Sequence, residues 1–126
     1  MWYAAHVILA YRYAEGTQTE FPVQENVYLV QADSFEEAYR TAERLGQEEG
    51  AYDKPSAVYD GVPVRLAFEG VRRVVECLPN DRLETGTELT YTEYLVDSED
   101  GLKDLVAGHD VPVVLQDFED DTTPPG

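Results

Sequence analysis

The chain has 126 residues, 43% of them hydrophobic, which is enough for one domain with a packed core. Its formal net charge of −17 argues against direct contact with nucleic acid, because phosphate backbones are bound by clustered Lys and Arg. No apolar run approaches the ~18 residues of a membrane span, so the sequence predicts a cytoplasmic protein that does not bind membranes.

The N-terminal part of the chain predicts a β-hairpin. Residues 2–13, WYAAHVILAYRY, alternate with apolar side chains on both faces, which is typical of a central strand. His6 and Arg12 interrupt this stretch and no cleavage site follows it, so a signal peptide is not expected. A loop with Gly and Pro over 14–22 then leads to a second strand at 24–32.

Residues 34–49 predict an amphipathic helix. Ser34 and Glu37 form an S-x-x-E capping box, which satisfies backbone N–H groups at a helix start. Apolar side chains follow at helical spacing and form one stripe: Phe35, Ala38, Tyr39, Ala42 and Leu45. Such a stripe needs a sheet to pack on, so the role expected for this helix is structural.

The middle of the chain predicts a loop followed by a long strand. Residues 50–63 hold two prolines and two glycines, together with Tyr52 and Tyr59. Exposed aromatic residues on irregular backbone often serve recognition, although packing across a sheet edge explains them equally well. The next strand is expected over 64–77, with a bulge at Gly70.

The C-terminal third predicts a strand, a short helix and a last strand. The strand is TELTYTEYLV at 87–96, and the helix over 97–108 is capped by Asp97 or Ser98. A short strand or extended arm follows at 111–118. The remaining residues are acidic and end in prolines, as expected of a frayed terminus.

These elements predict an α+β fold. The order β-β-α-β-β with a short α-β extension indicates a mostly antiparallel sheet of four to five strands, with the main helix on one face. Residues 1–96 are expected to form a single domain. Residues 97–126 are expected to be an acidic C-terminal extension that either packs on this domain or trails from it.

The motifs of common enzyme classes are absent from the sequence, including G-x-S-x-G, C-x-x-C and H-E-x-x-H. His6 lies mid-strand among apolar residues and His109 lies in a loop, so with one cysteine they make a poor zinc site. Cys77, the only cysteine, excludes an internal disulfide and is expected to be a buried structural thiol. The sequence therefore predicts a protein that is not an enzyme, with no catalytic residues, cofactor or metal.

Four fragments occur in order along the chain: WYAAHVI, ENVYLVQADSFEEAYRTAERLGQEE, FEGVRRVVEC and GTELTYTEY. Together they resemble a bacterial family named domain of unknown function 4288, over about residues 2–95. The shared positions are cap, stripe and strand positions, and the resemblance implies no activity. Residues 97–126 depart from the usual short form, so a function specific to this chain is expected in that acidic extension.

The leading hypothesis is a small, acidic, non-enzymatic module that binds a protein partner. Residues 81–126 carry 13 acids and 2 bases, which suits an inhibitor or immunity-type protein that masks a basic surface. The charge also fits simple solubility, and this alternative stays open. Candidate partner-binding residues are Tyr52, Tyr59, Asp117, Glu119, Asp120 and Asp121.

Two further hypotheses rest on other features. The first is a small-molecule-binding module or unrecognised enzyme with an aromatic pocket on the sheet, and its candidate residues are Trp2, Tyr11, Tyr28, Tyr91 and Tyr94. The second is a homodimer, in which an exposed strand edge pairs across a two-fold axis. Self-association is compatible with either of the other functions.

Overall fold

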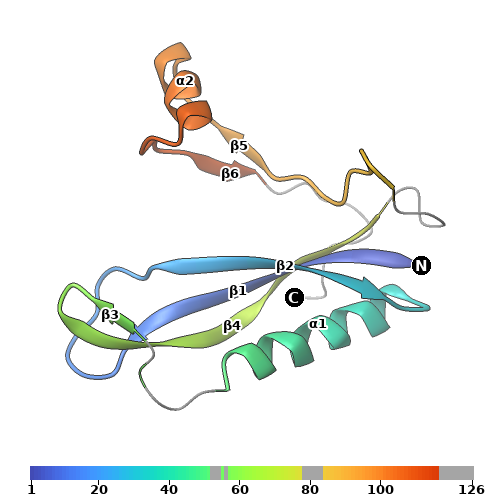
Figure 1. Cartoon of the computed structure of the whole chain (residues 1–126), viewed down its shortest axis with the longest axis horizontal. Coiled ribbons are helices and arrows are strands. Elements are labelled where there is room, and N and C mark those ends of the chain that lie inside the picture. Colours follow the sequence, from blue (N-terminus) through green and yellow to red (C-terminus); the bar gives the residue numbers. More distant parts are fainter. Residues whose placement is uncertain (52–54, 56, 78–83, 117–126) are drawn as a thin grey trace. The chain divides into compact units, whose positions relative to one another are not determined.

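The computed structural model describes residues 1–51, 55, 57–77 and 84–116. The chain divides into two compact units, Met1–Leu89 and Thr90–Asp121, named here the sheet unit and the hairpin unit. The predicted α+β class is confirmed. The sheet unit holds a four-stranded antiparallel sheet with a helix on one face, and the hairpin unit holds a two-stranded sheet and a second helix (Figure 1).

The main sheet has the strand order β2-β1-β4-β3, and every neighbouring pair is antiparallel. Its strands are β1 at Trp2–Tyr13, β2 at Val23–Gln31, β3 at Ala57–Tyr59 and β4 at Val62–Glu76. The apolar character of both faces of β1 thus fits its central place. The register of β1 with β4 shifts twice around Gly70, in agreement with the bulge predicted there.

Strand β3 corrects the prediction that residues 50–63 form only a loop. Asp60 and Gly61 join β3 to β4, with positive φ angles of 52° and 76°. Positive φ at both central residues gives a turn whose twist suits a hairpin, and Asp-Gly is a preferred pair for it. The Asp60-Gly61 pair is therefore the sequence signal for this strand.

The strand predicted at 87–96 is shorter than expected and has a different partner. Only Glu93–Leu95 forms a strand, β5, and it pairs with β6 at Val114–Gln116 instead of joining the main sheet. Alternating hydrophobicity specifies which side chains share a face but does not name the neighbouring strand. A short connection through one helix favours pairing between β5 and β6, because successive elements are usually neighbours.

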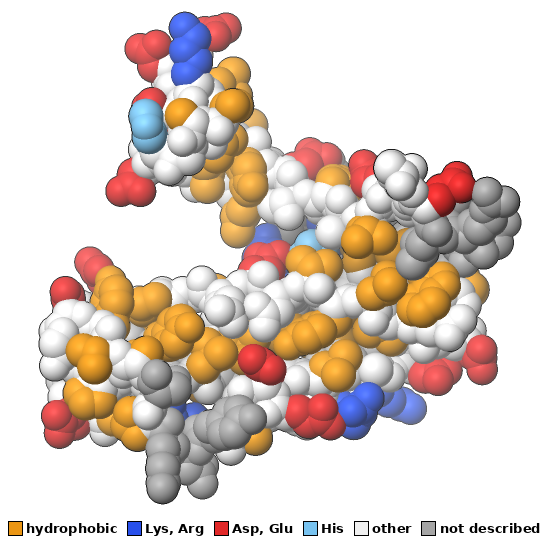
Figure 2. All heavy atoms as spheres, viewed as in Figure 1, with side chains coloured by type: hydrophobic (Ala, Val, Ile, Leu, Met, Phe, Trp, Pro, Cys, Tyr) orange, Lys and Arg blue, Asp and Glu red, His pale blue; other side chains and the backbone are white. Residues whose placement is uncertain are grey.

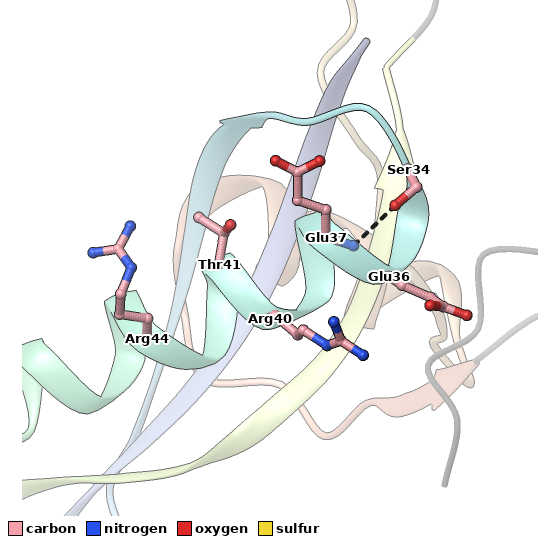
Figure 3. Close-up of a pocket in the computed structure, with 6 residues that line it drawn as sticks. All are labelled: Ser34, Glu36, Glu37, Arg40, Thr41 and Arg44. Carbon is pink, nitrogen blue, oxygen red and sulfur yellow. Dashed lines mark hydrogen bonds between the residues drawn. The ribbon is translucent and has the colours of Figure 1, made fainter.

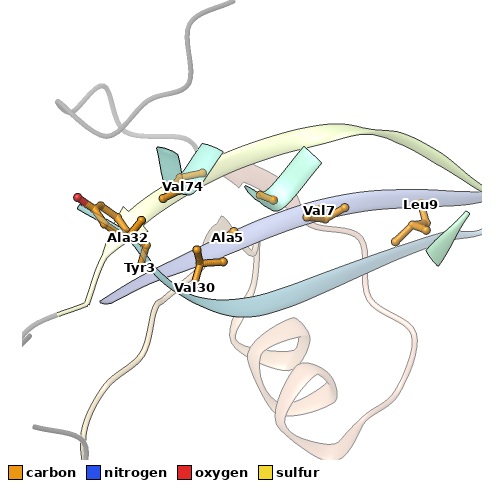
Figure 4. Packing of buried hydrophobic residues seen from close by; sticks show 9 residues of the cluster. Tyr3, Ala5, Val7, Leu9, Val30, Ala32 and Val74 are labelled. Carbon is orange, nitrogen blue, oxygen red and sulfur yellow. The ribbon is translucent and has the colours of Figure 1, made fainter. Parts of the chain in front are cut away.

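Helix α1, Phe35–Glu49, packs on the sheet through its predicted apolar stripe. Ser34 is the N-cap: its Oγ accepts a hydrogen bond from the backbone N of Glu37 at 3.1 Å. The Glu37 carboxylate accepts one from the backbone N of Asp33 at 3.0 Å, one residue before the N-cap, so the return bond of the predicted capping box is displaced by one position. The buried cluster between helix and sheet (Figure 4) comprises Tyr3, Ala5, Val7, Leu9, Val30, Ala32, Ala38, Ala42 and Val74.

The hairpin unit contains helix α2, Glu99–Ala107, between β5 and β6. Ser98 is the N-cap, one of the two residues predicted for this role, and its Oγ accepts from the backbone N of Gly101 at 2.9 Å. Gly108 ends the helix with a left-handed φ of 80°. In the part of the chain that the structure describes, neither helix is long and apolar enough to cross a membrane.

Candidate interaction surfaces

The sheet has a second face, opposite α1, which is named here the outer face. Residues directly opposite one another in the register share a face, and the core residues Val7 and Val74 lie on the side of α1. The outer face therefore carries the alternate residues of each strand. From β1 and β2 these are Trp2, Ala4, His6, Ile8, Ala10, Arg12, Val23, Glu25, Val27, Leu29 and Gln31.

The outer face contains a buried histidine, His6, that contacts a carboxylate. Its Nδ1 lies 2.7 Å from Oε2 of Glu25 on the neighbouring strand, and only 1% of the His6 side chain is exposed. Nδ1 donates to the carboxylate in this geometry, because an ionised carboxylate can only accept. The position agrees with the mid-strand place among apolar residues that the sequence gives His6, and the contact holds the Glu25 side chain toward the centre of the sheet.

A second charged cluster on the outer face centres on Arg12. Its Nε and Nη2 donate to the two carboxylate oxygens of Glu69, each at 2.6 Å. The guanidinium also lies over the ring of Phe21, with Cζ 5.5 Å from the ring centroid. The hydrogen bonds from Arg12 lower the pKa of the Glu69 carboxyl, and the positive charges of Arg12 and Arg65 lower it further. Burial acts in the opposite direction and raises this pKa, but the net shift is downward. The cluster thus largely neutralises its own charge.

Strand β2 adds a row of apolar side chains to the outer face. Val23, Val27 and Leu29 are 57%, 47% and 42% exposed. They alternate along the strand with residues that face α1, and β2 is an edge of the sheet. An apolar row at a sheet edge is a surface suited to another protein chain.

The hairpin unit exposes much of its apolar surface. Among its described residues Gly101 alone is buried. A Cβ added at Gly101 would lie 2.7 Å from Cγ1 of Val96 and 3.4 Å from Cγ2 of Val111. Helix α2 and the hairpin thus meet through this small residue, and little else is enclosed. The exposed large apolar residues of β5, α2, β6 and the segment before β6 are Tyr94, Leu95, Leu102, Val106, Val113, Val114 and Leu115.

Negative charge surrounds this apolar surface. The acids among residues 90–116 are Glu93, Asp97, Glu99, Asp100, Asp104 and Asp110, against one base, Lys103. Figure 2 shows hydrophobic side chains running along the hairpin unit with acidic side chains at its periphery. The sequence predicts a function in the acidic extension at 97–126, but the acidic candidate residues named there lie at 117–121 and leave out this apolar surface. The alternation of apolar and acidic residues over 93–116 is the signal that could have found it.

The five aromatic residues predicted to bind a small molecule are spread over several surfaces. Trp2 lies on the outer face, whereas Tyr11 and Tyr28 lie on the face that carries α1. Tyr28 packs against the core, and its hydroxyl lies 3.3 Å from Nδ2 of Asn26. Tyr91 and Tyr94 belong to the hairpin unit, and both are 43% exposed. Within the sheet unit, the predicted residues are therefore divided between two opposite faces.

Of the residues predicted to bind a protein partner, the structure describes Tyr59. It ends β3 and is half-buried, and desolvation raises the pKa of its hydroxyl, with the carboxylates of Glu20 and Asp60 adding to the effect. The other predicted residues lie outside the described residues: Tyr52, Asp117, Glu119, Asp120 and Asp121.

Two shallow hollows lie along α1, not on the outer face of the sheet. One, of about 330 Å³, is lined by residues from Ser34 to Arg44 that project from the same helix face (Figure 3). The other, of about 310 Å³, is lined by Phe35, Glu36, Tyr39, Arg40 and Glu43. A single helix cannot enclose a ligand, and none of the predicted aromatic residues lines either hollow. Among the described residues, no three His, Cys, Asp or Glu side chains gather as metal ligands.

Comparison with known families matches residues 2–91 to DUF4288, a domain of unknown function. The chain belongs to this family. No curated protein and no solved structure matches it. The DUF4288 match covers the main sheet and α1 and ends before β5, so β5, α2 and β6 lie beyond the matched residues. The exposed apolar surface of the hairpin unit is thus carried by the part of the chain outside the DUF4288 match.

Proposed function

We propose that this protein is a non-enzymatic interaction module that binds a protein partner through its hairpin unit. The observation that carries the proposal is the exposure of large apolar side chains there: Leu95, Val106 and Val114 are 60%, 89% and 61% exposed. Exposed apolar surface of this kind, rimmed by polar residues, is characteristic of protein interaction sites.

The charge around that surface defines the chemistry of the partner. Six acids and one base among residues 90–116 favour a partner whose apolar contact area is flanked by Lys and Arg. Such charges steer the encounter and select against acidic partners, while the apolar side chains supply most of the binding energy. The partner expected is therefore a basic protein surface or a basic amphipathic segment.

A sharper form of the proposal makes the protein an inhibitor or immunity-type protein. The Arg and Lys residues of a nucleic-acid-binding surface are arranged to meet phosphates, and an acidic module can occupy the same place. The acids at 117–121 in the sequence extend the negative charge of the hairpin unit. Duplex DNA added to the complex would then compete with this protein for the partner.

The test begins with capture of the full-length tagged protein from a lysate of the cells that make it, at low and high salt. The partner that is captured with it is then purified, and its affinity is measured for the wild type and for the double variant Leu95→Ser, Val106→Ser. Both residues are exposed, so the variant should fold normally, and an affinity loss of about tenfold to a hundredfold is expected. Val58→Ser, on a 69% exposed residue of β3, is the matched control.

Charge is tested separately with Asp104→Asn, Asp110→Asn, compared with Glu36→Gln, Glu49→Gln on α1. The first pair should slow association and weaken the salt dependence of binding, whereas the second should change little. Binding that is unaffected by both hairpin-unit variants would overturn the proposal. Retention of a metabolite without any protein would instead favour the small-molecule alternative.

A further inference from the structure

We propose that β2 is a self-association site, at which two copies of the chain pair edge to edge across a two-fold axis through Val27. The proposal concerns the opposite end of the sheet from β3 and uses no residue of the hairpin unit. It therefore goes beyond the proposed function and is independent of it.

The hydrogen bonds at both ends of β2 show which backbone groups are free to pair. Tyr11 N donates to Pro22 O at 2.9 Å, and Ala32 N donates to Met1 O at 3.0 Å. Antiparallel ladders alternate, so the even-numbered residues between Pro22 and Ala32 bond to β1. The odd-numbered residues direct their N–H and C=O groups to the outer edge of the sheet, where no described strand pairs with them: Val23, Glu25, Val27, Leu29 and Gln31.

Strand β2 lacks the features that usually protect an edge. It is nine residues long, contains no Pro, Lys or Arg, and pairs with β1 without any register shift. Its one charged residue is Glu25, whose carboxylate contacts His6 at 2.7 Å and is thereby held toward the centre of the sheet. The opposite edge is different, because β3 has only three residues.

The sequence of β2 is complementary to itself in one antiparallel register. With Val27 opposite Val27 of a second copy, Glu25 lies opposite Leu29 and Val23 lies opposite Gln31. Every outward N–H and C=O group of the strand then has a partner, and no two like charges face each other. A register centred on Glu25 would place two carboxylates opposite one another, which is destabilising.

This register also covers apolar surface. Val27 and Leu29 are 47% and 42% exposed on the outer face, and their side chains would lie beside those of the second copy. Because paired residues share a face, both copies of α1 would lie on the same side of one continuous sheet. The interface is isologous, as expected for a closed dimer.

The test is the oligomeric state of the full chain, measured by sedimentation over a range of concentrations. The wild type should be a dimer, and Val27→Lys should weaken it at least about tenfold, because two ammonium groups then meet at the axis. Val27→Glu should have the same effect. An equimolar mixture of the two variants should recover a dimer that contains one copy of each, since opposite charges now face each other.

Val58→Lys, on the exposed edge strand β3, should leave the dimer unchanged. Far-ultraviolet circular dichroism of each variant checks that the fold is retained. A monomeric wild type, a dimer that persists in Val27→Lys, or a failure of the mixture to dimerise would each overturn the proposal. None of these results would bear on partner binding by the hairpin unit, which is measured with Leu95→Ser, Val106→Ser.

Discussion

His6 of the central strand and Glu25 of the edge strand are joined by a contact of 2.7 Å between Nδ1 and Oε2. His6 is the one buried polar side chain among the described residues, and Glu25 is the one charge of β2. The contact thus satisfies a buried nitrogen and withdraws a carboxylate from the sheet edge. This one contact therefore stabilises the sheet and also leaves the edge of β2 without a projecting charged side chain.

Loss of the Glu25 carboxylate should destabilise the sheet unit. Glu25→Ala removes an acceptor from a buried donor, so the free energy of unfolding should fall by about 1–3 kcal/mol. Glu25→Gln keeps an acceptor oxygen and should lose less. The measurement is urea unfolding of both variants, with Glu15→Ala in the exposed loop as control. Equal stability of Glu25→Ala and Glu15→Ala would contradict the prediction.

The Arg12–Glu69 pair should make stability depend on acid pH. Because the folded state lowers the pKa of Glu69, chiefly through the hydrogen bonds from Arg12, its contribution is fully present above the unfolded pKa. It is lost as the pH falls through the lowered folded pKa. Arg12→Met should therefore move the Glu69 titration, followed by carboxyl carbon NMR, back toward the ordinary Glu value.

Arg44→Met is the control for this titration, since Arg44 pairs with Glu48 on the exposed side of α1 at 2.8 Å. It should leave the Glu69 titration unchanged. A Glu69 carboxyl that titrates at its ordinary value in the wild type would show that the pair does not persist in solution.

The contact between α1 and the sheet should not tolerate a side chain at Gly46. An added Cβ would overlap the Phe68 ring and lie 2.8 Å from Cγ1 of Val7. Ala is the better helix former by about 1 kcal/mol, but overpacking a core typically costs about 1–3 kcal/mol. Gly46→Ala should therefore lower the unfolding midpoint, whereas Gln47→Ala, on the exposed side, should hold or raise it. An equally stable Gly46→Ala variant would show that the helix can shift freely.

The local elements of the sheet unit follow from short-range rules. The Ser34 cap, the stripe on α1 and the two apolar faces of β1 each depend on neighbouring residues, and all are present in the structure. The same holds for α2, whose Ser98 cap and Gly108 end are encoded within one short segment. Such features can be predicted because their partners lie a few residues away.

The candidate surfaces depend on pairings that no local pattern specifies. Which strand pairs with β5 depends on contacts between residues far apart in the sequence. Its partner β6 could therefore not be inferred from the alternation over 87–96. The His6–Glu25 contact likewise requires the β1–β2 register, which places residues 19 positions apart beside one another. Only the Asp60-Gly61 turn carried a local signal that predicts a strand otherwise treated as loop.

Cys77 should react slowly with thiol reagents in the native protein. It is 1% exposed, its Sγ donates to the backbone O of Leu89 at 3.3 Å, and burial raises the pKa of the thiol, with Glu76 adding to the effect. The thiolate is the reactive form, so near neutral pH alkylation should be about a hundredfold slower in buffer than in urea. Mass spectrometry of iodoacetamide-treated samples measures both rates. A variant that destabilises the sheet unit, such as Gly46→Ala, should react faster than the wild type in buffer. Rapid alkylation of the native wild type would instead place Cys77 among the accessible, reactive cysteines.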